Sequence, residues 1–200
     1  MRSLAKGDDT RSSILEQALE LSAEVGLEGL TVGTLAKRVG MSKSGLYAHF
    51  ESKEDMQRQV LDAAASYFVD AVVSPALKQP RGLPRVRALF ERWIDWISSN
   101  ERRGGCLFIG SATELDDRPG PVRDTLVGHL RDVTGTIARA AAIAIEEGHF
   151  RDDLDLDQFA FEVWGILLTH HHFERLMGNR DARKRASVAF AALVRRATPA

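Results

Sequence analysis

Residues 31–53 carry the pattern that most restricts what this chain can fold into. In the first part of this segment, apolar residues recur at the i, i+3, i+4, i+7 spacing of one helical face, namely Val32, Leu35, Ala36 and Val39. Thr31 is the expected N-cap of this helix, and Gly40 after it has the freedom that a sharp turn requires. A second short helix is predicted from Lys43 to His49. Two short helices joined by a glycine turn are typical of a DNA-reading helix-turn-helix.

The first residues of the second helix are the candidates for contact with bases, because the N-terminal end of a recognition helix points at the floor of the major groove. Lys43 can reach O6 and N7 of guanine, and Ser44 can bond to either base edge. The alternative for Lys43 is contact with phosphate only. Gly45 is expected to allow close approach of the helix backbone, and Ser42 is the expected N-cap.

The N-terminal quarter of the chain resembles the TetR/AcrR family of bacterial transcriptional regulators over roughly residues 10–56. The segments that carry the resemblance are Thr10-Arg11-Ser12-Ser13-Ile14-Leu15, Gly26-Leu27-Glu28-Gly29-Leu30-Thr31, Leu46-Tyr47-Ala48-His49-Phe50 and Ser52-Lys53-Glu54. The Ser44-Gly45 pair departs from the family pattern, in which glycine comes first. The departure changes which side chain faces the bases, so the resemblance does not imply an operator sequence.

The resemblance implies further contacts with the DNA backbone. In the matching family positions, Tyr47 and His49 would bond to phosphates. Thr31 and Lys53 would add contacts from the first turns of the flanking helices, where the helix dipole favours anions. The resemblance also implies a homodimer that binds a double-stranded operator and responds to a small-molecule effector.

Charge is distributed unevenly along a chain whose net charge is only −1. Residues 8–30 carry six acidic residues against Arg11, a net charge of −5, whereas residues 31–53 carry four basic residues against Glu51, a net charge of +3. The positive charge therefore falls on the segment proposed to meet phosphate. The acidic face of the first helix is expected to point away from DNA.

The remaining sequence predicts an all-α fold of about nine helices, with no strand pattern and no internal repeat. We expect an N-terminal three-helix domain with the helix-turn-helix at 1–52 and a C-terminal helical domain for ligand binding and dimerisation at 53–200. A connecting loop is predicted near 74–83, where Ser74-Pro75 and Gln79-Pro80-Arg81-Gly82 interrupt the helical pattern. Further helices are predicted from about 84, 122, 155 and 182, with Asp155 capping the third of them.

The last two helices are the candidates for a dimer interface. Residues 159–168 are apolar nearly all the way round, which a helix on the surface of a monomer would not tolerate. The last helix carries an apolar face rich in alanine, which lets a partner approach closely. As in the family that the chain resembles, the two helices would form a four-helix interface with their symmetry mates. The interface residues predicted are Phe161, Trp164, Leu168, Ala186, Phe190 and Leu193.

A ligand pocket is predicted from aromatic side chains and two histidines of the C-terminal domain: Trp93, Trp96, Phe108, Trp164, His170 and His171. Aromatic residues on amphipathic helices are also buried where no ligand exists, so ordinary core packing is the alternative. Three consecutive histidines at 170–172 diverge by about 100° per residue on a helix and cannot share one metal on one face. We therefore predict no metal site, and place His170 and His171 at a ligand cavity or at the dimer interface, with ordinary surface or capping positions as the alternative.

Several classes of protein are not supported by this sequence. It contains no Gly-rich phosphate loop, no HExxH motif and one cysteine, Cys106, without a catalytic context, so neither an enzyme nor a bound cofactor is predicted. Its longest strongly apolar stretch, 160–169, is about half of a membrane span. The first residues lack a secretory core, which with the lone cysteine favours the cytoplasm.

The function predicted is a homodimeric, ligand-responsive transcriptional regulator, a repressor released from a palindromic operator by a small, largely apolar effector. One alternative is a ligand-independent regulator or activator. Another, from a different class, is a small-molecule-binding helical protein or enzyme that uses the His170-His172 region.

Overall fold

The computed structural model describes residues 2–99 and 105–199, and within these ranges all regular secondary structure is helical. Counting continuous helical segments once, the described part contains nine helices, which confirms the predicted fold class. The chain forms two compact units, 1–67 with 100–128, and 68–99 with 129–200. Most of the helix Lys53–Phe68 and residues 105–128 group with the N-terminal helices, and the functional division at 52/53 stays a prediction.

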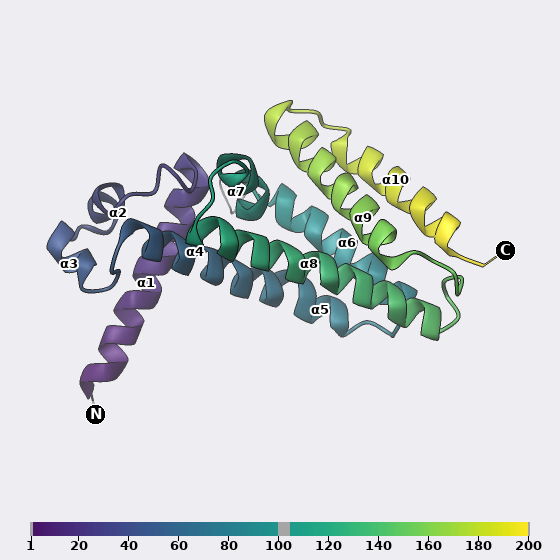
Figure 1. Cartoon of the computed structure of the whole chain (residues 1–200), viewed down its shortest axis with the longest axis horizontal. Coiled ribbons are helices and arrows are strands. Elements are labelled where there is room, and N and C mark those ends of the chain that lie inside the picture. Colours follow the sequence, from purple (N-terminus) through teal and green to yellow (C-terminus); the bar gives the residue numbers. More distant parts are fainter. Residues whose placement is uncertain (1, 100–104, 200) are drawn as a thin grey trace. The chain divides into compact units, whose positions relative to one another are not determined.

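The first unit is built on α1 (Arg2–Val25), against which α2 (Val32–Val39) packs, with α3 (Lys43–Tyr47) beside α2 (Figure 1). The unit also contains α4 (Lys53–Phe68) up to Tyr67, α7 (Leu107–Leu115) and the first turns of α8 (Pro121–Glu146). Its core consists of buried aliphatic and aromatic side chains, including Ile14, Leu21, Leu30, Leu35, Leu46, Phe50, Met56 and Leu61. Burial of this apolar surface is what holds the short helices α2 and α3 in place.

The predicted break at Ser74-Pro75 is wrong, because α4 continues through the π-helical turn η1 (Val69–Val73) into α5 (Ser74–Leu77). In η1 the N–H of Ser74 bonds to the carbonyl of Val69, five residues back. This wider turn directly precedes Pro75, whose ring has no N–H to donate to a regular helical ladder. The chain leaves the helix only after Leu77, and Gly82, with φ of 84°, precedes the next helix.

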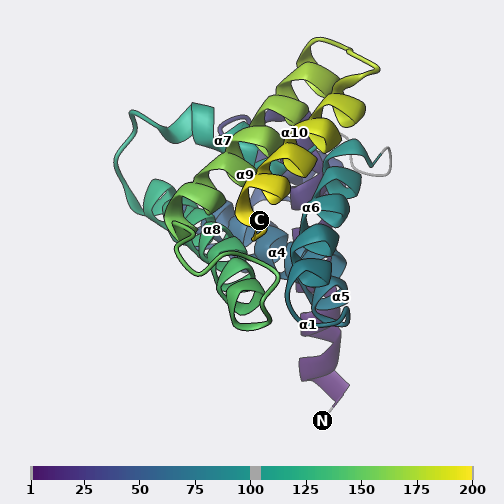
Figure 2. The same ribbon diagram turned by 90° about the vertical axis from the view of Figure 1, so that its right-hand side faces the viewer.

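The second unit contains α6 (Leu83–Ser98), the rest of α8, α9 (Leu156–His171), the π-helical turn η2 (His172–Leu176) and α10 (Ala182–Ala197). Both views show α9 and α10 side by side along their length (Figures 1 and 2). Asp155 caps α9 as predicted, its carboxylate accepting the Gln158 N–H at 2.9 Å. The core is lined chiefly by α6, α8, α9 and α10, with Phe90, Trp93, Ile97, Ile137, Phe159, Val163, Leu167 and Phe190 buried.

One helix in the described part, Lys53–Leu77, is long and apolar enough to cross a membrane by length and composition alone. A third of its apolar window is buried inside the chain. Its fully buried residues, such as Val60, Ala64, Phe68 and Val72, recur every three to four positions, and Asp62 and Asp70 interrupt the exposed side. This is the pattern of a helix that packs on one side against a protein core.

Candidate nucleic-acid interface and helical core

Helix α2 begins and ends as the sequence predicts. The hydroxyl of Thr31 accepts the Thr34 N–H at 3.1 Å, and the hydroxyl of Thr34 accepts the Thr31 N–H at 2.9 Å, which completes a reciprocal capping box. At the other end, Gly40 is left-handed, with φ of 68° and ψ of 27°, and its N–H bonds to the carbonyl of Ala36. The backbone therefore turns sharply at a residue that carries no Cβ.

Helix α3 has one buried and one exposed side. Its N-cap, Ser42, accepts the Gly45 N–H at 3.1 Å, as predicted, but the helix ends at Tyr47 rather than at His49. Leu46 is fully buried, whereas Lys43, Ser44 and Tyr47 are exposed, Tyr47 to 57%. The polar and basic side chains of α3 therefore face solvent from a helix that its apolar residue fixes to the unit.

Gly45 has a structural role in addition to the predicted one. A Cβ at Gly45 would lie 3.3 Å from the hydroxyl of Ser42 and 3.4 Å from the terminal methyl of Met41. The absence of a side chain thus leaves room for the cap of α3. Lys43 extends toward α2, where its Cε would lie 3.3 Å from a Cβ at Gly33, so its ammonium stands near the N-terminal turn of α2.

The acidic residues before α2 do not all point away from the basic segment, contrary to expectation. Arg38 pairs with Glu24 at 2.6 Å, and Lys53 pairs with Glu28 at 3.4 Å while donating to the Glu28 carbonyl at 3.0 Å. Among the described residues no ion pair involves Lys43, so it remains the exposed cation at the start of α3. The half-buried His49 follows the end of α3.

The predicted aromatic ligand set divides between the two units. Trp93, Trp96 and Trp164 belong to the second unit, where the rings of Trp93 and Trp164 lie 5.6 Å apart and Phe68 contacts Trp93 edge-on at 4.8 Å. Phe108 lies on α7 in the first unit and is buried there. Trp93, Trp96 and Phe108 are buried and Trp164 is half-buried, and their assignment to a ligand pocket stays a prediction.

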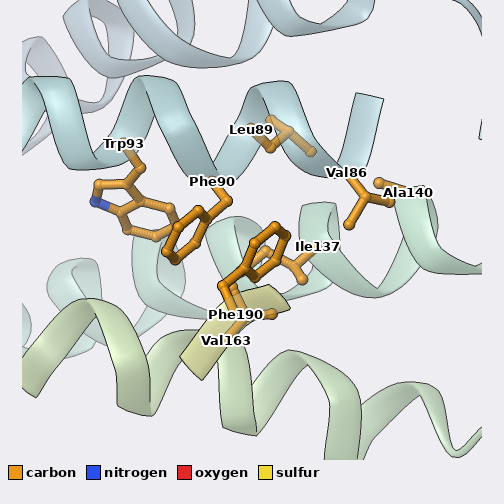
Figure 3. A pocket seen from close by; sticks show the side chains of 8 residues that line it. All are labelled: Val86, Leu89, Phe90, Trp93, Ile137, Ala140, Val163 and Phe190. Carbon is orange, nitrogen blue, oxygen red and sulfur yellow. The ribbon is translucent and has the colours of Figure 1, made fainter. Parts of the chain in front are cut away.

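One apolar cavity in the second unit is small. A cavity of about 10 Å³, lined by eight apolar or aromatic side chains, lies between α6, α8, α9 and α10 (Figure 3). It is about the space of one water molecule. Figure 3 shows the rings of Phe90 and Phe190 facing each other in this region, while the indole nitrogen of Trp93 lies at the end of the ring farther from Phe190.

His170 is a buried residue with polar partners. It is 2% exposed, and its Nε2 lies 3.3 Å from the hydroxyl of Ser98 and 3.4 Å from the carboxylate of Glu174. Burial lowers the pKa of His170, although the negative charge of Glu174 opposes that shift. The Ser98 hydroxyl donates to Glu174 at 2.8 Å, which joins α6 to η2.

His171 and His172 point in other directions from the same helix. Burial, together with the nearby positive charges of His172, Arg175 and His170, lowers the pKa of His171 to about 4. His172 is exposed, with Nδ1 3.0 Å from the carbonyl of Leu168.

The six predicted interface residues are not equivalent in the structure. Phe161 is 70% exposed, and Trp164 and Leu168 are half-buried. The ring of Phe190 stacks on Phe90 inside the unit and is only 4% exposed. Ala186 and Leu193 are also buried and lie on the floor of an open groove of about 680 Å³ between α9 and α10.

Sequence reasoning missed the groups that hold the turn at residues 26–30. Gln57 donates to the Leu27 carbonyl at 2.7 Å, and the carboxylate of Glu114 accepts the Glu28 N–H at 2.8 Å. The carboxylate of Glu28 also pairs with Arg118 at 3.2 Å. Polar residues this distant in sequence give no periodic signal, so the sequence did not predict these contacts with the turn.

A capped helix-turn-helix with an exposed basic helix start, followed by a helical unit with its own core, defines a helix-turn-helix DNA-binding regulator. Residues 14–60 match the family of bacterial regulatory proteins called the tetR family, and residues 82–190 match the tetracyclin repressor-like C-terminal domain. The second match covers more than half of the chain. The chain therefore belongs to the TetR family of transcriptional regulators and is not an enzyme.

Known proteins similar to this chain agree with that assignment. The negative transcriptional regulator IcaR of the biofilm operon icaADBC in Staphylococcus aureus is 23% identical over 141 residues, which cover 70% of this chain and 72% of IcaR. A TetR transcriptional regulator from Chloroflexus aurantiacus has a similar structure, with a TM-score of 0.84, 23% identity and coverage of 97% and 95% of the two chains. AibR, solved with isovaleryl coenzyme A and operator DNA, gives a TM-score of 0.74 at 21% identity, with coverage of 92% and 97%.

Proposed function

We propose that this chain is a homodimeric repressor that reads a palindromic operator with α3 and is released from it by a small, largely apolar effector. The observation that carries the proposal is the exposed N-terminal turn of α3, fixed by the Ser42 cap and by the buried Leu46. From this turn Lys43 and Ser44 would contact base edges, and Gly45 would let the backbone come near the groove.

The phosphate contacts proposed come from around α3. Tyr47 and the half-buried His49 would bond to phosphates on one side, and the cap of α2 at Thr31 would do so on the other. Lys53 would add a cation at the start of α4. Because its ammonium also bonds to Glu28, Lys53 would both hold the turn at residues 26–30 and face the DNA backbone.

The proposed dimer uses the outer faces of α9 and α10. The groove between these helices has an apolar floor that includes Gly165, Ile166, Ala189 and Ala192, and small residues allow close helix approach. Phe161 and Val188 are 70% and 63% exposed on the same two helices. A second copy related by a two-fold axis would cover this surface, and two such copies would place two α3 helices on two half-sites.

The proposed effector response is supported by unused hydrogen-bonding groups in otherwise apolar surroundings. Among the described residues, the indole N–H of Trp93 in the second unit and the hydroxyl of Ser111 in the first unit are buried without a hydrogen-bond partner. A ligand with hydrogen-bonding atoms would satisfy such buried groups. AibR, which has a similar fold, is solved with isovaleryl coenzyme A and operator DNA, so the fold accommodates both kinds of partner in that protein.

The proposed mechanism couples effector and operator through the helix that begins at Lys53. A ligand that binds two conformations of the core with different affinity would shift this helix and change the separation of the two α3 helices. Half-sites lie about one turn of DNA apart, roughly 34–36 Å, or a multiple of that distance, so a small shift would weaken binding. As a DNA-binding regulator of this kind, the protein would act in the cytoplasm.

A ligand-independent regulator is the second candidate, and the cavity of about 10 Å³ favours it. An effector that binds in this cavity would need the surrounding core of the second unit to open. Operator binding measured across a ligand library separates the two candidates. If at least one ligand abolishes operator binding at constant salt, the sensor is supported. If operator affinity stays unchanged with every ligand that binds the protein and raises its melting temperature, the ligand-independent regulator is supported.

Regulation itself is tested by fusing the selected operator to a reporter in cells that contain or lack the chain. A repressor lowers reporter output, and substitution of Lys43 with Ala restores it. Output that rises with the chain would instead identify an activator.

A further inference from the structure

The turn at residues 26–30 sets where α2 leaves α1, and therefore where α3 stands in the first unit. Gly26, the first residue of this turn, is left-handed with φ of 80°. The Leu27 and Leu30 side chains are fully buried, so the turn has an apolar anchor. Within the turn the Leu30 N–H bonds to the Leu27 carbonyl at 3.2 Å, and further partners of its backbone groups come from other elements.

Glu114, on α7, makes two contacts with this turn. One carboxylate oxygen, Oε2, accepts the Glu28 N–H at 2.8 Å. The other, Oε1, lies against the Cα of Gly26 so closely that a Cβ at that position would overlap it. Gly26 therefore combines a positive φ with the absence of a side chain at the point where the Glu114 carboxylate contacts it. Glu114 lies 88 positions further along the chain.

Residues from α4 hold the same turn from another direction. Lys53 donates to the Glu28 carbonyl, and Gln57 donates to the Leu27 carbonyl through a buried bond of 2.7 Å. Arg118, just after α7, pairs with the carboxylate of Glu28 at 3.2 Å. All of these residues belong to the first unit, so the arrangement is internal to it.

We infer that Glu114 is a positioning residue for DNA reading, which fixes the turn at residues 26–30 and through it the placement of α2 and α3. The inference rests on the proposed function, because its readout is operator binding. Glu114 lies on the first helix after the chain passes from α6 in the second unit back into the first unit.

The test compares three variants with the wild-type dimer on two DNA duplexes. One duplex is selected from random DNA by the wild-type protein, and the other has the same length and a scrambled sequence. Glu114→Ala removes both contacts, and Glu114→Gln keeps an oxygen that can accept the Glu28 N–H. Asp117→Ala removes the same charge from an exposed position nearby, where no described contact involves the carboxylate. Circular dichroism at the assay temperature verifies folding.

We expect Glu114→Ala to lower affinity for the selected duplex about tenfold, since a hydrogen bond to a charged acceptor is lost. The affinity of Glu114→Ala for the scrambled duplex should change by the same factor as that of Asp117→Ala, because each variant loses one negative charge. Glu114→Gln should remain within a few-fold of wild type. The deciding quantity is the ratio of the affinity for the selected duplex to the affinity for the scrambled duplex. General destabilisation of a folded dimer would lower both affinities together and leave this ratio unchanged.

An unchanged ratio in a folded Glu114→Ala variant would overturn the inference and leave the proposed function intact. The inference would also be overturned if Asp117→Ala lowered this ratio as much as Glu114→Ala does, since the loss of a negative charge alone would then explain the effect. If Glu114→Ala does not fold, Glu114→Asp decides, because the shorter carboxylate withdraws from the Glu28 N–H. A lowered ratio in that variant supports the inference, and a wild-type ratio overturns it. A wild-type protein that selects no duplex would overturn both proposals.

Discussion

The ring of Phe190 on α10 stacks on the ring of Phe90 on α6, with centroids 3.9 Å apart and planes 4° from parallel. Both side chains are nearly fully buried, and both line the small cavity of the second unit (Figure 3). This contact fixes the inner face of α10 to the core of its own chain. The outer face, with Ala189 and Ala192, is then the part of α10 that remains for a partner.

Substitution of Phe190 with Ala should therefore destabilise the fold of the second unit. Truncation of a buried phenylalanine removes its burial energy and leaves a cavity, which together cost about 3–5 kcal/mol. Urea denaturation at a fixed dimer concentration measures the loss. A loss below about 1 kcal/mol, within the range of surface substitutions, would contradict the packing described here.

Substitution of Ala189 with Glu should disrupt the dimer while leaving each chain folded. A charge on the floor of the groove between α9 and α10 would be buried against the partner without a compensating ion. Sedimentation velocity should show monomers at concentrations where the wild type is dimeric. Ser187→Glu adds the same charge to an exposed position of α10 outside the groove lining and serves as control. Monomers in both variants, or in neither, would argue against this face as the interface.

Lys43 and Tyr47 should affect DNA binding in different ways. Lys43→Ala should relax the preference for particular bases, with a cost of about 1–3 kcal/mol on the preferred duplex. Tyr47→Ala should weaken binding to all duplexes alike, since its proposed contact is to phosphate. Selection of DNA with each variant, followed by affinity measurements, tests both. An unchanged base preference in Lys43→Ala would remove Lys43 from the base-reading residues.

The free energy of unfolding should fall as the pH drops from about 6.5 toward about 4. In this range the unfolded chain binds a proton at His171 that the folded chain does not bind, because burial lowers the pKa of His171 to about 4. This contribution to stability is complete above pH 6.5 and declines in acid. His170, whose pKa is also lowered by burial, should act in the same direction.

Chemical denaturation of wild type and His171→Gln at several pH values measures this effect. At pH 8 the difference between the two proteins reports packing alone, since the histidine is neutral in both states. Toward pH 4.5 the wild type should lose more stability than the variant. Parallel losses in the two proteins would show that His171 does not cause the acid sensitivity.

Local patterns predicted most of the helices because their signals lie close together in sequence. The caps at Thr31, Ser42 and Asp155 and the left-handed Gly40 are each fixed by residues within a few positions, and the structure has them all. The break predicted at Pro75 was wrong because a π-helical turn ahead of it accommodates the missing N–H. No local rule signals that turn.

Relationships between distant elements could not be predicted in the same way. The apolar face of the last helix was correctly identified, but Phe190 could equally have met its own core or a partner, and only the stack on Phe90 decides. The pairing of Arg38 with Glu24 likewise depends on how α1 packs against α2. Glu114 gave no signal at all, since it contacts Glu28 across 86 residues.

The most direct test of the central claim is selection of binding sites from random DNA by the purified wild-type chain, followed by sequencing. We expect enrichment of an inverted repeat whose half-sites are centred about 10–10.5 base pairs apart, or a multiple of that spacing. Enrichment should disappear when Lys43, Ser44 and Tyr47 are replaced together by Ala. A wild-type chain that enriches no sequence, or a site without two-fold symmetry, would contradict a dimeric reader built on α3.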